Sequence, residues 1–194
     1  MKPFLRSEAP DWLIKNWEKW GKQFKLKVDS TKKKNEFKWY SYKKEKVNKL
    51  LYPILRDLTQ NHCSFCDGFP LQQTGETIEH FKPKSKFPLL SYQWENLYIS
   101  CHNCQQKLDE FNDSLLQPDK SDYEFSEYFI FNYSSGEIKE NPAKSLSNQQ
   151  KAKETIRIYR LNDFGRPEDR KRVFKQFNDS NNPMIDDFAY RFML

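Results

Sequence analysis

Apolar residues in the first sixty positions recur at helical spacing. Residues 10–27 carry a stripe rich in aromatic side chains, made of Trp12, Leu13, Trp17, Trp20 and Phe24. A second stripe falls within residues 36–60, at Val47, Leu50, Leu51, Ile54, Leu55 and Leu58. Positions three or four residues apart lie on one face of a helix, so the pattern predicts two helices. Pro53 either kinks the second helix or marks a boundary in it. We expect the aromatic stripe to face the core or a protein partner rather than to stack on bases.

The pattern changes after residue 60. Short apolar runs predict strands over residues 76–81 and 97–100, and the segment between them, residues 82–93, contains prolines typical of a loop. A helix is predicted over residues 102–112. The expected order in this part of the chain is therefore strand, loop, strand, helix.

The last third of the chain predicts a mixture of irregular structure and helices. Residues 113–147 are expected to be irregular except for a hairpin around residues 128–137, and helices are predicted over residues 148–161 and 167–178. The fold class is therefore α+β and mostly helical. We divide the chain into a basic, aromatic helical region for partner or nucleic-acid contact (1–60), a central core (61–115), and a hairpin with C-terminal helices (116–194).

Composition limits the class of protein. A length of 194 residues suits one domain or one catalytic module with helical additions, and 16% aromatic residues can supply a core. Only 5 glycines argue against a barrel or a glycine-rich phosphate loop. The sequence has no 18-residue apolar run and no signal peptide, so we expect a cytoplasmic protein without membrane contact.

Positive charge is concentrated at the start of the chain. Residues 1–60 hold 16 Lys and Arg against 7 Asp and Glu, a net charge of +9, whereas residues 61–118 carry −3 and the remainder is neutral. Such a surface suits a phosphate backbone. A solvated helix face explains the charge equally well, and charge alone leaves both interpretations open.

All 4 cysteines fall in two CxxC pairs, Cys63 with Cys66 and Cys101 with Cys104. Thiols stay reduced in the cytoplasm, and two residues between cysteines allow both sulfurs to bind one ion. The duplicated spacing predicts one structural Zn²⁺ site that closes the long insertion between the pairs. A redox role for one pair would leave the other pair unexplained, and a four-thiolate site needs neither His62 nor His102.

An acidic residue and a histidine are adjacent in the segment between the two CxxC pairs, which we call the zinc clamp. Glu79 and His80 end the first predicted strand, and Asn96 precedes the second. Because neighbouring strand residues point to opposite faces, both side chains reach one substrate only at a strand end or bulge. A carboxylate can bind a divalent ion while an imidazole takes a proton from water, which is the chemistry of phosphodiester hydrolysis. An isolated Glu-His pair is weak, but its position before Asn96 and a helix led by a CxxC pair favours a nuclease.

These motifs resemble the HNH endonuclease family, a branch of the His-Me finger nucleases, whose pattern is CxxC, an acidic-His pair, an Asn-Leu strand, and CxxC followed by Asn and a later Lys. Residues 79–84 and 94–101 look like a narrower subgroup, the PtuB-type proteins of Septu and retron-associated antiphage systems. Residues 152–162 and 170–172 resemble that subgroup's C-terminal helix pair. The resemblance covers residues 60–175 and implies a zinc-clamped ββα-metal core between N- and C-terminal helices.

The resemblance also implies roles for individual residues. His80 would be the general base, Glu79 a ligand of a catalytic Mg²⁺ or Mn²⁺, and Asn96 the residue that fixes the loop and orients His80. The position after the last cysteine, normally Asn or His, is Gln105 here, whose amide oxygen can still bind a hard ion. Asp109, one helical turn later, is a further candidate ligand.

The sequence departs from the family pattern at one more position. The family's lysine position holds Leu108, although Lys107 is adjacent. These departures put the second metal ligand in doubt and allow for weak or conditional activity.

The subgroup implies a toxic nuclease effector controlled by a PtuA-like SMC/ABC ATPase, joined in retron systems by a reverse transcriptase and its msDNA. The substrate would be DNA or RNA, including tRNA. The aromatic N-terminal helix or the C-terminal helices would dock the ATPase. The alternatives are a catalytically weak or inactive zinc-ribbon module that binds nucleic acid or the ATPase, and a purely structural adaptor.

Overall fold

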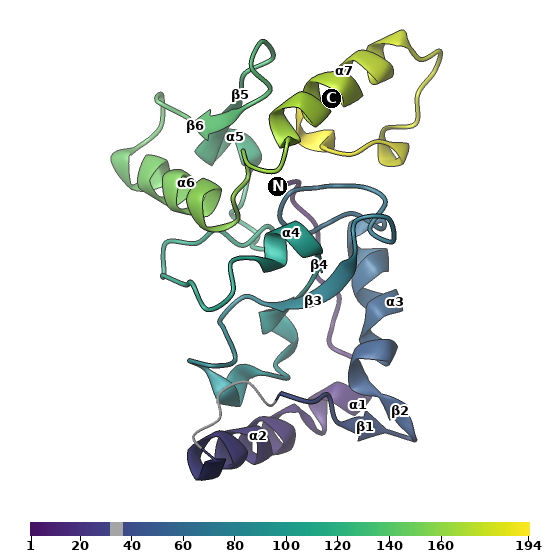
Figure 1. Cartoon of the computed structure of the whole chain (residues 1–194), viewed down its shortest axis with the longest axis vertical. Helices are drawn as coiled ribbons and strands as arrows, with labels where there is room; N and C mark the ends of the chain where they lie inside the picture. Colours follow the sequence, from purple (N-terminus) through teal and green to yellow (C-terminus); the bar gives the residue numbers. More distant parts are fainter. Residues whose placement is uncertain (32–36) are drawn as a thin grey trace.

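The predicted helix over residues 10–27 forms as two helices separated by a turn. In the computed structural model, which describes residues 1–31 and 37–194 (Figure 1), α1 spans Asp11–Ile14 and α2 spans Trp17–Thr31. The turn contains Asn16, whose Nδ2 donates a 2.7 Å hydrogen bond to the carbonyl of Trp12. A side-chain donor competes in this way with the backbone bonds of a continuous helix.

The aromatic stripe packs into the core. Trp20 and Phe24 are 7% and 3% exposed. Trp20 belongs to the main apolar core of the protein, and Trp12 and Trp17 are partly buried against that core. The helix α2 also packs against the 3₁₀ turn η1 (Pro88–Leu90), where a Cβ on Gly21 would lie 2.2 Å from the carbonyl oxygen of Leu89. The core location expected for the stripe is thus confirmed for Trp20.

The second predicted helix, over residues 36–60, is wrong in its first part. Residue 36 lies outside the described residues. The segment that follows forms a small hairpin, β1 (Ser41–Tyr42) and β2 (Glu45–Lys46), and α3 occupies only Val47–Thr59. Lys43 and Lys44 take positive φ values at the turn of the hairpin. Pro53 lies inside α3 and does not end it.

The central segment has the predicted order of elements. The strands β3 (Glu76–His80) and β4 (Leu97–Cys101) pair antiparallel, with Glu76 opposite Cys101 and His80 opposite Leu97. The loop between them contains η1 and a second 3₁₀ turn, η2 (Trp94–Asn96). The helix that follows, α4, spans only His102–Gln105 and is shorter than predicted. The chain then turns, and Leu108 has a φ of 50°.

The C-terminal part contains the predicted hairpin and two helices. The short helix α5 (Phe125–Tyr128) leads into β5 (Phe129–Phe131), which pairs antiparallel with β6 (Ile138–Glu140). Two longer helices follow, α6 (Leu146–Ile158) and α7 (Arg166–Asp179), and the chain continues through η3 (Ile185–Asp187) and η4 (Arg191–Met193). Figure 1 shows α6 beside the hairpin and α7 on the other side of the central elements from α2.

One large apolar cluster joins most of the chain. It includes Leu13, Tyr98 and Tyr159, one residue from each of the three regions proposed from the sequence. A smaller cluster around Val173 and Tyr190 lies between α7 and the end of the chain. The protein is therefore a mixed helix and strand fold in which helices predominate, and the three-part division stays a prediction.

In the part of the chain that the structure describes, no helix has the length and apolar character required to cross a membrane.

Candidate metal site and active site

The four cysteines meet at one buried point. Cys63 and Cys66 follow α3, Cys101 ends β4, and Cys104 lies in α4. Their sulfur atoms all lie within 4.8 Å of one another, with 3.6 Å between Cys66 Sγ and Cys101 Sγ, and all four are free thiols. A tetrahedral Zn²⁺ with Zn–S bonds of about 2.3 Å places its sulfurs about 3.8 Å apart. The donor set and its spacing therefore fit Zn²⁺.

A backbone N–H group and an arginine side chain donate hydrogen bonds to the sulfurs. The backbone N–H of Cys101 donates to Cys63 Sγ at 3.3 Å. Arg166, at the start of α7, places Nη2 3.2 Å from Cys104 Sγ and 3.8 Å from Cys101 Sγ. His62 and His102 are not part of the cluster; the Nε2 of His62 lies 3.0 Å from the carbonyl oxygen of Phe188, and the Nε2 of His102 lies 2.9 Å from Gln106 Nε2.

His80 lies at the end of β3 with one nitrogen tied to the backbone. Its Nε2 is 2.9 Å from the carbonyl oxygen of Ser91. A carbonyl only accepts, so Nε2 carries the proton and a neutral ring has its lone pair on Nδ1. No residue that the structure describes hydrogen-bonds Nδ1. Burial, reinforced by the charge of Lys84, lowers the pKa of His80 to about 3, so the ring is neutral at neutral pH.

Aromatic side chains hold the ring of His80. Trp39 stacks on it with ring centroids 5.6 Å apart and an angle of 20°, and Phe37 meets it edge-on at 5.2 Å. Only 5% of His80 is exposed. The segment before the β1–β2 hairpin therefore packs directly on the predicted general base, a contact that the sequence pattern did not indicate.

Glu79 is buried beside a lysine. Lys107 Nζ lies 2.8 Å from Glu79 Oε1 and 3.2 Å from the carbonyl oxygen of His80, and Lys107 is 1% exposed. Burial raises the pKa of Glu79 to about 7, while the charge of Lys107 acts in the opposite direction. In the sequence, Lys107 is adjacent to the position where the HNH pattern has lysine, and the sequence did not predict its contact with Glu79. The early end of α4 turns this side chain inward.

Asn96 fastens the loop between the two strands. Its Oδ1 accepts from the backbone N–H of Lys82 at 2.7 Å, and its Nδ2 donates to the carbonyls of Lys82 and Leu90 at 3.1 and 3.0 Å. Ser91, the residue after Leu90, supplies the carbonyl that holds His80. Asn96 thus acts on the histidine through the loop, and the direct partner of the ring is Ser91.

Except for Asn96, the predicted catalytic residues and ligands of the catalytic ion line one pocket of about 510 Å³. Its walls include Glu79, His80, Gln105 and Asp109, together with Lys84 and His102. The structure therefore brings all four candidates together. Among the described residues, however, the cysteines alone form a group of three or more His, Cys, Asp or Glu residues with ligand atoms within 4.8 Å. The exposed side chain of Leu108 also lines this pocket, at the position where the HNH sequence pattern has lysine.

Comparison with known proteins relates part of this chain to a curated protein. No family model matches this chain. Over 87 aligned residues the chain is 29% identical to the Septu protein PtuB of Bacillus mycoides (strain KBAB4). The alignment covers 38% of this chain and 28% of that relative. The chain thus matches less than a third of the relative's length. The similarity supports a Septu-related protein, and the HNH class stays a prediction.

Proposed function

We propose that the protein is a metal-dependent endonuclease of the HNH type that acts as the effector subunit of an antiphage defence complex. The observation that carries this proposal is the environment of His80: an imidazole whose Nε2 is held by Ser91, next to Glu79, in a pocket whose walls come from the end of β3 and from α4, the helix that contains Cys104. The similarity to a Septu protein supports the defence role.

In this proposal, His80 supplies the proton transfer of phosphodiester hydrolysis. His80 Nδ1 takes a proton from water as the water oxygen bonds to phosphorus. The bond from phosphorus to the leaving oxygen then breaks, and that oxygen receives a proton from solvent. The imidazolium that forms keeps its Nε2 bond to Ser91, which becomes charge-assisted. Lys84, on the pocket wall, is placed to attract the substrate phosphate.

A divalent ion would be held by Glu79, through the oxygen that Lys107 does not occupy, with Gln105 and Asp109. Mg²⁺ is commonly bound by one or two carboxylates, with water and substrate phosphates completing its shell, so these residues fit the ion in the presence of substrate. When bound, Mg²⁺ or Mn²⁺ would neutralise charge that develops on the phosphate and leaving oxygens. The residues alone offer an incomplete shell, which predicts weak binding without nucleic acid.

The partner proposed for this subunit is a PtuA-like SMC/ABC ATPase, with a reverse transcriptase and msDNA if the system is a retron. The substrate would be DNA or RNA, with tRNA among the candidates. On the N-terminal side, docking would use the exposed face formed by α1 and α2, where Ile14 of α1 and Leu26 of α2 are 54% and 68% exposed beside several lysines. The C-terminal helices are the other candidate for this contact.

A second function is favoured by one contact. Lys107 already neutralises Glu79, the principal expected ligand of the catalytic ion. A non-catalytic zinc module that binds nucleic acid or the ATPase would show the same pair. Such a module would bind its partner without cleaving nucleic acid.

The test is cleavage of single-stranded DNA, double-stranded DNA and tRNA by the purified chain, alone and with its ATPase, in Mg²⁺ and in Mn²⁺. We expect cleavage of at least one substrate that chelation of the added ion abolishes and that Glu79→Ala removes. Lys153→Ala, which changes an exposed ion pair far along the sequence from the pocket, serves as the control. Binding without cleavage under every condition would favour the zinc module.

A further inference from the structure

A buried arginine faces the cysteine cluster from a distant part of the sequence. Arg166 is the first residue of α7, is 4% exposed, and places Nη2 3.2 Å from Cys104 Sγ. Its Nη1 donates to the carbonyls of Tyr159 and Arg160 at 3.1 and 2.6 Å, just after α6 ends. Among the ion pairs of the described residues, none joins Arg166 to a carboxylate. The sulfurs are therefore its anionic partners.

Charge balance links this arginine to the metal. A Zn²⁺ ion bound by four thiolates carries a net charge of −2, whereas four protonated thiols carry none. A buried guanidinium is stable only with a compensating anion. The zinc-loaded cluster supplies that anion, and the N–H groups of Arg166 in turn disperse the charge of the thiolates. Each side is expected to stabilise the other.

Other residues at the start of α7 also contact the junction of α6 and α7. One turn later, the fully buried Arg170 donates to the carbonyls of Leu161 and Gly136, the second at the turn between β5 and β6. The start of α7 packs against that turn so closely that a Cβ on Gly136 would lie 2.0 Å from the carbonyl oxygen of Pro167. The position of α7 is thus fixed at its first two turns.

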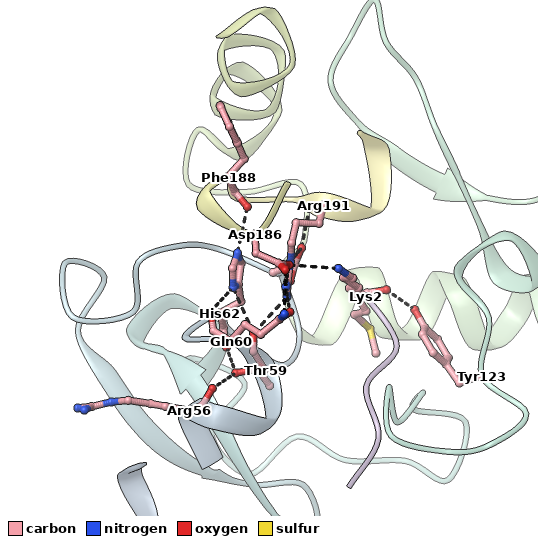
Figure 2. A network of polar contacts seen from close by, with 11 residues as sticks. Lys2, Arg56, Thr59, Gln60, His62, Tyr123, Asp186, Phe188 and Arg191 are labelled. Carbon is pink, nitrogen blue, oxygen red and sulfur yellow. Dashed lines mark hydrogen bonds and ion pairs between the residues drawn. The ribbon is translucent and has the colours of Figure 1, made fainter. Parts of the chain in front are cut away.

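The end of the chain holds the first cysteine pair without touching sulfur. Arg191 Nη2 lies 2.7 Å from Oδ1 of Asp67, the residue after Cys66, and Figure 2 shows Arg191 meeting Gln60 and Asp186 at the end of α3. His62 joins this network through its Nδ1, which is 2.6 Å from the carbonyl oxygen of Gln60, while its Nε2 lies 3.0 Å from that of Phe188. The anionic partner of Arg191 is the carboxylate of Asp67, so this contact does not require the metal. The anionic partners of Arg166, in contrast, are the sulfurs of the cluster.

We propose that Arg166 is the charge-neutralising partner of the zinc cluster, and that zinc loading thereby controls the docking of the α6–α7 junction on the central strands. The sulfurs add the metal-dependent contact of Arg166 to the contacts that Arg170 and Pro167 make at the start of α7, while the contacts of Arg191 hold residues 60–67 independently. This assignment does not depend on nuclease activity.

The experiment measures zinc affinity, by competition with a chromophoric chelator, for the wild type, Arg166→Gln, Arg166→Lys and the control Arg160→Gln. Arg160 lies near the same junction but is exposed and pairs with Asp163. Loss of a group that hydrogen-bonds metal ligands typically weakens metal binding about 10–100-fold, and we expect this for Arg166→Gln. Arg166→Lys should show a smaller loss, because an ammonium keeps the charge but lacks the planar fork.

Hydrogen exchange of the zinc-loaded proteins tests the docking. Amides of residues 159–170 should exchange faster in Arg166→Gln than in Arg160→Gln, while amides of residues 59–67 should remain protected. If Arg166→Gln does not fold, Arg166→Lys carries both measurements. Zinc affinity and protection equal to those of the control, in whichever Arg166 variant folds, would overturn the proposal.

Discussion

Replacing Lys107 by methionine should destabilise the protein far more than replacing an exposed lysine. The change keeps the length of the side chain and removes the ammonium 2.8 Å from a carboxylate that is 5% exposed. Loss of one partner of a buried ion pair costs about 3–5 kcal/mol, because the other charge stays buried without compensation. Burial raises the pKa of Glu79 to about 7, so with Lys107 present Glu79 is mostly protonated at pH 6 and charged at pH 9. We therefore expect a loss of this size for Lys107→Met in denaturation at pH 9 and a smaller loss at pH 6.

Urea denaturation of zinc-loaded protein measures this loss, with Lys25→Met as the matched control. Lys25 pairs with Asp29 at 2.6 Å, but both side chains are about half exposed, and such pairs contribute about 0.3–0.5 kcal/mol. Adding Glu79→Gln to Lys107→Met should recover most of the stability, because the uncompensated charge is then gone. A loss from Lys107→Met no larger than that of the control, or a double variant as unstable as the single one, would refute the reasoning.

Three further predictions concern the loop, the metal ligand and the core. Asn96→Ala should lower the free energy of unfolding by about 1–3 kcal/mol, because it leaves buried backbone groups unpaired. It should also reduce cleavage while the zinc content stays unchanged. A thermal stability equal to that of the wild type would count against the hydrogen bonds described for the loop. Gln105→Asn should lower the Mg²⁺ concentration needed for half-maximal cleavage, since the shorter amide matches the family's usual ligand; an unchanged requirement would remove Gln105 from the ligand set. Trp20→Ala should cost about 3–5 kcal/mol in chemical denaturation, as expected for a buried aromatic side chain, whereas a loss below 1 kcal/mol would contradict its place in the core.

Local pattern predicted the elements that carry the site. The short apolar runs around Ile78 and Ile99 indicated two strands, and the spacing of the cysteines indicated that their sulfurs meet. These features depend on residues close together in sequence or on a motif with fixed geometry. For the same reason, the pattern placed His80 at a strand end.

Contacts between distant segments could not be predicted in this way. Arg166 reaches Cys104 across 62 positions, and Trp39 reaches His80 across 41. Lys107 turns inward because α4 ends early and Leu108 adopts a left-handed backbone conformation, which nothing in a helical pattern announces. The hairpin before α3 was missed because a basic, aromatic segment next to a helix was included in the helix.

The central claim is that His80 is the general base of a nuclease, and chemical rescue tests it most directly. Removing a general base typically lowers the rate about 10²–10⁴-fold. We predict such a loss of cleavage for His80→Ala and its partial recovery when imidazole is added, because the imidazole can occupy the space left beside Trp39 and Ser91. Equal zinc content in wild type and variant would show that the clamp is intact. Cleavage by His80→Ala at the wild-type rate would contradict the account.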